Sequence, residues 1–164
     1  EIKNIEVDKK PTSIFVTVSD KYLSPTGNGL YEDLIFTTIV NNKNGLESWS
    51  LKILRENGRL EKEFSGDSGI PRYIKWNGLN ESGKIVEGNY TALFSAKYTK
   101  GNKPEAKSSN FLLDISAPLG SIDISPLPFS PDNDGVDDEV SIKMIVRDAS
   151  QIKKWYLETE THHF

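Results

Sequence analysis

Residues 129–136 read Phe-Ser-Pro-Asp-Asn-Asp-Gly-Val, and residues 23–30 read Leu-Ser-Pro-Thr-Gly-Asn-Gly-Leu. The two stretches align without a gap at an offset of 106 positions, and the same offset carries Trp49 onto Trp155. Self-similarity at a fixed offset is the sequence signature of repeated modules. A repeat of this length, close to the usual size of a domain, predicts a tandem array of domains joined end to end.

The repeat divides the chain into four segments. Residues 1–12 resemble the end of the next module, so we expect them to hold the last strand of a preceding repeat and its linker. Residues 13–117 are predicted to form one complete module, and residues 118–158 the first half of a following one. Residues 159–164 form a tail that could derive from a vector. The chain is therefore expected to be a piece of a longer array.

Composition is ordinary for a globular protein. It argues against nucleic acid binding, a membrane span and cysteine chemistry. The net charge of −4 arises from 20 basic and 24 acidic residues without a basic stripe, so we do not expect nucleic acid binding. The sequence has no apolar run long enough for a membrane span. It also has no cysteine, which excludes disulfides and thiolate chemistry.

Alternation of apolar and polar residues dominates the chain, and no segment has a helical period. The expected strands cover residues 13–18, 33–40, 46–53, 60–64, 73–76, 88–98 and 108–114. About seven short strands in about one hundred residues, with frequent turn signals, predict an all-β, immunoglobulin-like antiparallel β-sandwich. A small barrel would give a similar pattern.

The apolar positions of these strands predict the core. We expect the core to contain Phe36, Trp49, Leu51, Trp76, Tyr90 and Phe94, each contributing about 2 kcal/mol on burial. Because Trp49 and Trp155 are equivalent in the repeat, a shared core position is expected for both. Trp76 has two interpretations, since it can plug one end of the sandwich or present an exposed face to a sugar or peptide.

The segment 76–90 begins with Trp-Asn-Gly, has a glycine at position 83 and ends with Gly-Asn-Tyr. It resembles the Trp-Asp-Gly, Gly, Gly-x-Tyr signature of the immunoglobulin-like domain of the flagellar hook-capping protein (FlgD-type). Residues 129–138 are similar to the Phe-Ser-Pro-Asn-Gly-Asp-Gly-x-Asn-Asp segment that opens related modules in exported bacterial envelope proteins. The resemblance covers most of residues 13–158. It implies an immunoglobulin-like fold in a protein of the periplasm, the outer membrane surface or the extracellular space.

The sequence departs from the family pattern at a few positions. Asn77 stands where the FlgD-type domain usually has Asp, and the first copy of the opening loop has Thr26, Gly27 and Asn28 in place of acidic residues. A tandem arrangement also differs from the single such domain of a hook cap. The resemblance therefore implies the fold more directly than a flagellar role, because one fold hosts many functions.

The segment 132–138 places four carboxylates within seven residues around a glycine turn. Oxygen ligands at alternating positions suit Ca²⁺, and the expected ligands are Asp132, Asp134 and Asp138. Such an ion would rigidify the junction between modules. The alternative is a solvated acidic turn, because the EF-hand spacing and its flanking helices are absent. The equivalent first-copy loop has Thr26, Asn28 and Tyr31 and is expected not to bind.

The sequence has no cluster of residues that indicates catalysis. Both histidines lie in the tail, and Ser65 and Ser68 have no nearby histidine to act as a general base. The many carboxylates cannot be paired from sequence alone. We therefore expect that the chain is not an enzyme.

These observations predict a non-enzymatic structural spacer or protein-interaction module. Its partners would be other immunoglobulin-like modules of the same chain or of another protein. Residues 118–158 are expected to pair with residues 5–8 or with a second molecule, since a half module exposes strand edges. One alternative is a carbohydrate-binding or host-binding adhesin module that uses Tyr73, Trp76 and Tyr98. Another alternative is assembly of a flagellar hook cap.

Overall fold

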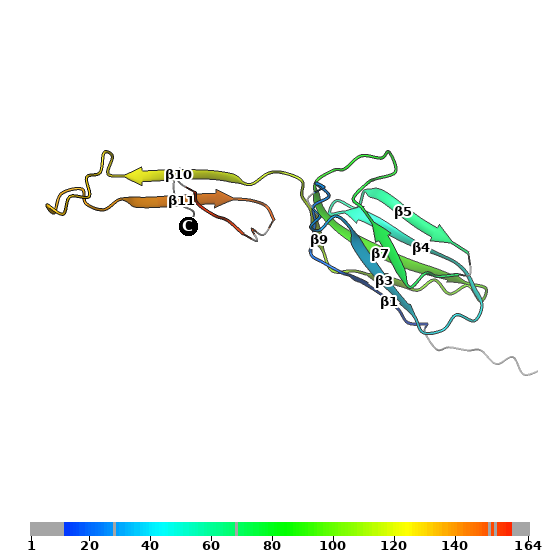
Figure 1. Ribbon diagram of the computed structural model, residues 1–164. Coiled ribbons are helices and arrows are strands. Elements are labelled where there is room, and N and C mark those ends of the chain that lie inside the picture. Colours follow the sequence, from blue (N-terminus) through cyan, green and yellow to red (C-terminus); the bar gives the residue numbers. More distant parts are fainter. Residues whose placement is uncertain (1–11, 28, 68, 151, 153, 159–164) are drawn as a thin grey trace, which may run out of the picture. The chain divides into compact units, whose positions relative to one another are not determined.

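The computed structural model describes residues 12–27, 29–67, 69–150, 152 and 154–158. The described residues are all-β, which confirms the predicted fold class, and they contain no helix long and apolar enough to cross a membrane. The chain divides between Ile115 and Ser116 into two compact units, which we call unit 1 and unit 2 (Figure 1). The strands are β1 (Ile14–Val18), β2 (Tyr22–Leu23), β3 (Leu34–Val40), β4 (Leu46–Arg55), β5 (Leu60–Gly66), β6 (Tyr73–Trp76), β7 (Gly88–Tyr98), β8 (Glu105–Lys107), β9 (Phe111–Leu113), β10 (Leu119–Ser125) and β11 (Ser141–Arg147).

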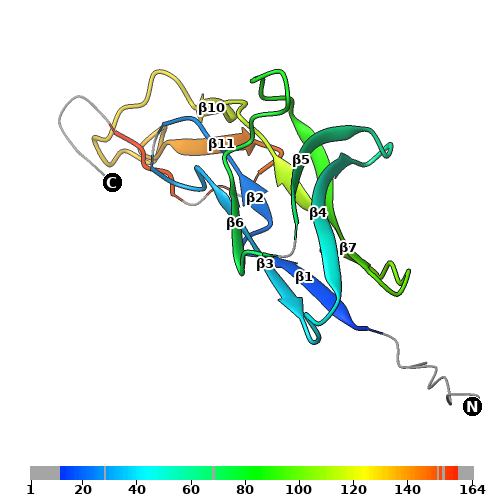
Figure 2. The same ribbon diagram turned by 90° about the vertical axis from the view of Figure 1, so that its right-hand side faces the viewer.

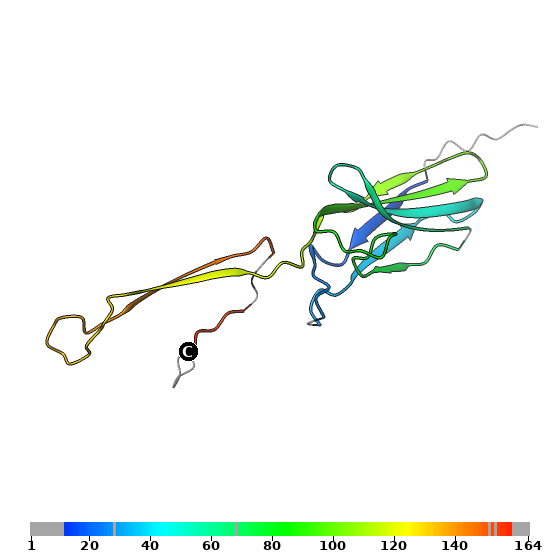
Figure 3. The ribbon, with the colours of Figure 1, turned by 90° about the horizontal axis from the view of Figure 1, so that it is seen from above.

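Unit 1 is a sandwich of two sheets. The smaller sheet is antiparallel, with the strand order β1-β3-β6. The larger sheet has the order β2-β9-β7-β4-β5, and β8 pairs with β7. In Figure 2 the smaller sheet lies on one side of unit 1 and β4, β5 and β7 on the other, and Figure 3 shows the two layers from above. Successive side chains of a strand point to opposite faces of the sheet, so the apolar residues of each alternating strand lie between the two layers.

Four aromatic rings join the two sheets. Phe36 and Trp76 come from the smaller sheet, and Tyr90 and Phe111 come from the larger one. The ring centroids of Phe36 and Phe111 lie 5.6 Å apart, and those of Trp76 and Tyr90 lie 5.7 Å apart. Trp76 meets both Tyr90 and Phe111 edge-on, a favoured geometry for aromatic pairs. All six predicted core residues, Phe36, Trp49, Leu51, Trp76, Tyr90 and Phe94, are buried.

The repeat seen in the sequence recurs in the strand pairing. In unit 1 Val16 pairs with Thr38 across β1 and β3. In unit 2 Ile122 pairs with Met144 across β10 and β11, and both residues lie 106 positions after their counterparts. All five residue pairs between β1 and β3 recur between β10 and β11 at this offset. The two units therefore share an identical strand register.

The expected core position of Trp155 is not found. Trp49 is 8% exposed in unit 1, whereas Trp155 is 62% exposed in unit 2. The physical reason is that the described strands of unit 2 form one two-stranded sheet, so no second layer covers its apolar face. The exposed apolar residues of that face are Ile122, Ile124, Ile142, Met144 and Val146.

Two short strands, β2 and β8, were not predicted from sequence. Strand β2 has only two residues and β8 has three, so neither contains enough alternation to be recognised. Residues 1–11 and 159–164 lie outside the described residues, and so does the expected pairing of residues 5–8.

The position of Trp76 generates a test of the core. We expect Trp76→Ala to lower the free energy of unfolding by about 3–5 kcal/mol, because it leaves a cavity beneath β6. The matched control is Tyr73→Ala on the same strand, where the side chain is 58% exposed and a loss below about 0.5 kcal/mol is expected. Urea unfolding followed by fluorescence measures both, and equal losses would contradict the assigned core.

Candidate functional site

The three predicted metal ligands are brought together in the loop between β10 and β11, at the tip of the hairpin (Figure 1). One carboxylate oxygen from each of Asp132, Asp134 and Asp138 lies within 4.8 Å of the others. Asp132 and Asp134 are exposed, and Asp138 is half-buried. Three carboxylates this close together are a set that could hold a metal ion, and a cation would relieve their mutual repulsion.

The same carboxylates also accept hydrogen bonds from the loop backbone. Asp138 accepts from the N–H groups of Asn133 at 2.6 Å and Gly135 at 2.8 Å. Asp134 accepts from the N–H of Val136 at 2.8 Å. These bonds orient the carboxylates toward the turn before any ion is present.

The corresponding loop of unit 1 has a closely similar conformation. The N–H of Gly29 donates to Glu32 Oε1 at 3.1 Å, as the N–H of Gly135 donates to Asp138 Oδ2 at 2.8 Å, 106 positions later. The left-handed turns also correspond, because Tyr31 has φ = 53° and its counterpart 106 positions later has φ = 55°. The repeat therefore dictates the conformation of this loop.

The two loops differ in charge. Thr26 and Asn28 occupy the positions of Asp132 and Asp134 in the sequence alignment. Because the described part of the unit 1 loop keeps the turn with Thr26 in place of Asp132, the carboxylate at position 132 is not required by the backbone conformation. The carboxylates of Asp132 and Asp134 are therefore additions to a scaffold shared by the two copies, whereas Asp138 corresponds to Glu32 of unit 1.

The three aromatic residues proposed for ligand binding do not form a common binding face. Tyr73 is exposed, but Trp76 is 2% exposed and Tyr98 is 4% exposed. The indole N–H of Trp76 donates to the carbonyl of Leu79 at 2.8 Å, and the hydroxyl of Tyr98 donates to the carbonyl of Asn42 at 2.6 Å. Burial also raises the pKa of Tyr98. Buried rings cannot stack on a sugar, which corrects the expectation from sequence.

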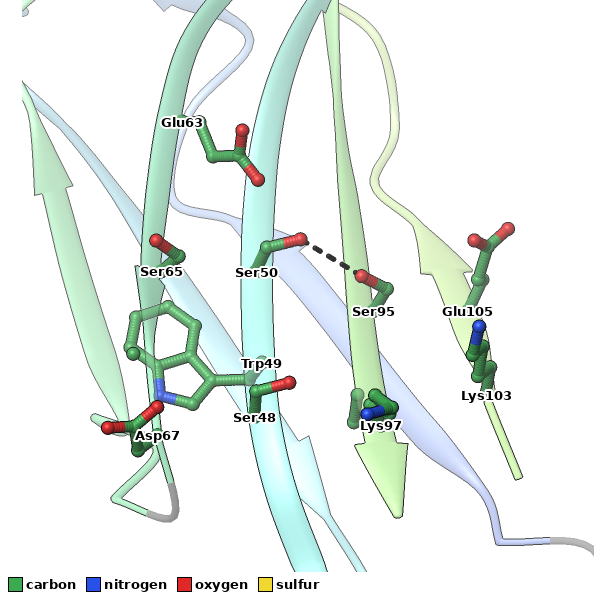
Figure 4. A pocket seen from close by; sticks show the side chains of 12 residues that line it. Ser48, Trp49, Ser50, Glu63, Ser65, Asp67, Ser95, Lys97, Lys103 and Glu105 are labelled. Atoms are coloured by element: carbon green, nitrogen blue, oxygen red, sulfur yellow. Dashed lines mark hydrogen bonds between the residues drawn. The ribbon is translucent and has the colours of Figure 1, made fainter. Parts of the chain in front are cut away.

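Sequence reasoning did not identify a polar hollow on the outer face of the larger sheet (Figure 4). Its volume is about 400 Å³, and Ser50, Ser65 and Ser95 lie side by side within it on three neighbouring strands. The hydroxyl oxygens of Ser50 and Ser95 lie 3.0 Å apart. No histidine lines the hollow, so these hydroxyls lack the usual general base. Alternation alone shows that each serine faces outward, but only the strand register brings them together.

A loop protects the exposed edge of β5. The carboxylate of Glu81 accepts the N–H of Glu63 at 2.9 Å and pairs with Lys62 Nζ at 3.1 Å. The backbone N–H of Glu81 donates to the carbonyl of Glu61 at 2.9 Å. The bond from the Glu63 N–H, followed by that from Lys62, lowers the pKa of Glu81. These contacts occupy backbone groups that would otherwise be open to another strand.

A buried carboxylate lies beside this loop. Glu61 is 4% exposed, and its Oε1 atom lies 3.4 Å from Arg59 Nε and 3.8 Å from Arg55 Nε. Its Oε2 atom accepts a hydrogen bond from the Asn80 side chain at 3.2 Å. The hydrogen bond between Glu61 and Asn80 attaches the loop after β6 to strand β5. These contacts give Glu61 a structural role.

Comparison with known proteins adds information on the fold. No known family model matches the chain, and a search of curated proteins found no match. The chain is similar to dimeric latent PorU from Porphyromonas gingivalis at 19% identity and a TM-score of 0.52, over 67% of this chain and 10% of PorU. It is also similar to a tetra-tandem repeat from the extending region of a large adhesion protein, at 19% identity and a TM-score of 0.42, over 70% of this chain and 27% of that one.

A third similar structure is the PmoD soluble domain from Methylocystis sp. ATCC 49242 (Rockwell), at 14% identity and a TM-score of 0.36, over 62% of this chain and 90% of that one. Of these three structures, PorU alone has a TM-score above 0.5. At 19% identity, this similarity to PorU is evidence about the fold and not about the function. The chain spans about a tenth of the length of PorU.

The lowered pKa of Glu81 predicts a pH-dependent contribution to stability. A depressed carboxyl pKa stabilises the fold above the ordinary value of 4.5, and this contribution is lost as the pH falls through the folded-state pKa. We expect Glu81→Gln to lower the urea midpoint at neutral pH, with a smaller difference from the unsubstituted chain in acid. Glu56→Gln, in an exposed turn, is the control. A difference that is equal at both pH values would contradict the assignment.

Proposed function

We propose that this chain is a non-enzymatic structural spacer and interaction module of an exported protein of the bacterial cell envelope. The observation that carries the proposal is the strand register of β1 and β3, which recurs in β10 and β11 at an offset of 106 residues. Domain-sized modules that repeat in one chain form a tandem array of units joined by linkers. Such an array suits a spacer.

The second and the last strands of unit 1 support a mechanical role. Strands β2 and β9 pair in parallel, with Tyr22 opposite Leu112 and Leu23 opposite Leu113. The N–H of Leu112 donates to the carbonyl of Lys21 at 2.8 Å, and the N–H of Asp114 donates to that of Leu23 at 3.0 Å. A force applied at the start of β2 and at the end of β9 pulls these two parallel strands in opposite directions along their axis. Their hydrogen bonds are then loaded together rather than one after another.

The sites found in the described residues favour recognition over catalysis. The hydroxyls of Ser50 and Ser95 contact each other and no general base. We therefore propose recognition and not catalysis for this hollow.

The resemblance to the FlgD-type domain supports the proposed exported location. The glycines of its signature adopt left-handed backbone conformations in unit 1, with φ = 83° at Gly78 and 69° at Gly83. Glycine adopts such angles without the steric cost that a Cβ atom adds, which gives these two signature positions a physical reason. The proposed location is the periplasm, the outer membrane surface or the extracellular space.

We also propose that the acidic loop of unit 2 binds Ca²⁺ through Asp132, Asp134 and Asp138. The proposal rests on the proximity of three carboxylate oxygens and on the near-identical loop of unit 1, which has Thr26 in place of Asp132. Hard oxygen ligands suit Ca²⁺, and extracellular modules bind it with dissociation constants of about 10⁻⁴–10⁻³ M. A bound ion would stiffen the tip of the hairpin.

The mechanical role is tested by pulling unit 1 along two directions. The chain has no native cysteine, so pairs of introduced cysteines define the attachment points. Attachment at Lys21 and Ser116 loads β2 against β9 in shear, whereas attachment at Asn57 and Asn89 separates β4 from β7 one pair at a time. We expect a several-fold higher unfolding force in the first geometry. Equal forces in single-molecule experiments would remove the mechanical argument.

Calorimetric titration tests the metal proposal. We expect Ca²⁺ to release heat with the unsubstituted chain and not with Asp134→Asn, which has the residue found at this position in the first copy. Asp123→Asn removes an exposed carboxylate outside the loop and should leave the heat unchanged. Heats that are the same for all three proteins would show that the loop is a solvated turn.

A further inference from the structure

The outer face of the smaller sheet is unusually apolar. It carries Phe15, Ile35, Ile39 and Tyr73, which are 52%, 41%, 47% and 58% exposed. Phe15 lies directly opposite Ile39, and Tyr73 lies opposite Thr37, the residue between the two isoleucines on that face of β3. The four side chains therefore form one continuous surface, which we call the outer face.

The internal repeat shows that strand pairing does not require this surface. Phe15 and Ile35 correspond to Ser121 and Ser141, which occupy the same register in β10 and β11. The second copy thus pairs its strands with serines at both positions. A clustered apolar surface that the fold does not need is typical of a binding site for another protein.

One end of the outer face is basic. A hollow of about 330 Å³ adjoins Ile39 and is lined by Thr38, Ile39, Val40, Lys43, Ile70 and Arg72. The guanidinium carbon of Arg72 lies 5.3 Å from the ring centroid of Tyr73. No carboxylate lines this hollow. The outer face and the hollow together fit a partner that presents apolar and anionic groups side by side.

Such a combination occurs in the loop between β10 and β11, residues 126–140, which we call the acidic loop. Its large apolar side chains Leu127, Phe129 and Val136 are 69%, 46% and 62% exposed. It contains no lysine or arginine, and its acidic residues are Asp132, Asp134, Asp137, Asp138 and Glu139. The charge and the exposed apolar groups of the loop complement those of the outer face.

We propose that the outer face of unit 1 binds the acidic loop of a second copy of this chain. The loop of unit 1 has Thr26, Asn28 and Tyr31 at three of the five acidic positions, so unit 1 has the apolar face with a far less acidic loop. The β10–β11 sheet has the acidic loop with serines in place of Phe15 and Ile35. Each copy therefore offers one acceptor and one donor. Such a head-to-tail contact is heterologous and adds further copies unless the assembly closes into a ring. The contact goes beyond the role of a spacer, which does not need to bind itself.

Analytical ultracentrifugation of the full chain, with EDTA present, tests the association. We expect the weight-average mass to increase between about 10 µM and about 1 mM protein, the range suited to a small contact. Raising NaCl from about 0.1 M to about 1 M shortens the Debye length from about 10 Å to about 3 Å, so association should weaken. A chain that stays monomeric over this range would overturn the proposal.

Two variants copied from the internal repeat separate the two halves of the contact. The face variant, Phe15→Ser with Ile35→Ser, has the serines found in unit 2. The loop variant, Asp132→Thr with Asp134→Asn, has the residues found in unit 1. Because the other copy tolerates each set, both variants should fold, which unfolding midpoints check. We expect each variant alone to associate at least about tenfold more weakly than the unsubstituted chain.

Mixing the two variants gives the decisive result. An intact loop on the face variant can bind the intact face of the loop variant, so the mixture should form dimers that do not grow. The control is Ile122→Ser with Ile142→Ser on the exposed face of the β10–β11 hairpin, which should associate like the unsubstituted chain. Loss of association in this control alone, or full association of both repeat-matched variants, would assign the contact elsewhere and overturn the proposal.

Discussion

Aromatic packing between the two sheets is the interaction on which unit 1 depends. Phe36, Trp76, Tyr90 and Phe111 are drawn from four strands and meet between the two sheets. Each ring fixes the face of the strand that carries it, because a shift of one residue would turn the ring to solvent. The register of both sheets, and thus the position of every surface residue, follows from this packing. With no cysteine in the chain, this core replaces the disulfide that joins the sheets in antibody domains.

The internal repeat separates what the fold requires from what each copy adds. Strand pairing and the conformation of the opening loop recur between the two units, so they belong to the shared scaffold. The apolar outer face occurs in unit 1, and the acidic loop occurs in unit 2. Phe15 and Asp132 are examples, since their counterparts are Ser121 and Thr26. Residues that differ at equivalent positions carry the candidate functions, because the other copy shows that the scaffold forms without them.

Sequence predicted the proximity of the three loop carboxylates better than it predicted the exposure of the aromatic residues. Asp132 and Asp134 are local neighbours, so a turn is enough to bring their carboxylates together. The aromatic surface was misjudged because alternation alone does not say which side of a sheet is covered. Trp76 and Tyr98 fall on covered faces and are buried, whereas Tyr73 points outward. Trp155 is the reverse case, since no described strand covers the sheet of unit 2.

The amino-acid sequence by itself determined the all-β class, the repeat, seven of the nine strands of the sandwich and six residues of its core, because these depend on local alternation and turns. The tertiary structure alone decided which outward residues share a surface. Ser50, Ser65 and Ser95 become neighbours through strand pairing between distant segments. Phe15 and Tyr73 likewise reach one face through β3. Such contacts depend on long-range register, which is set by the packing of the whole sandwich and not by any short stretch of the chain.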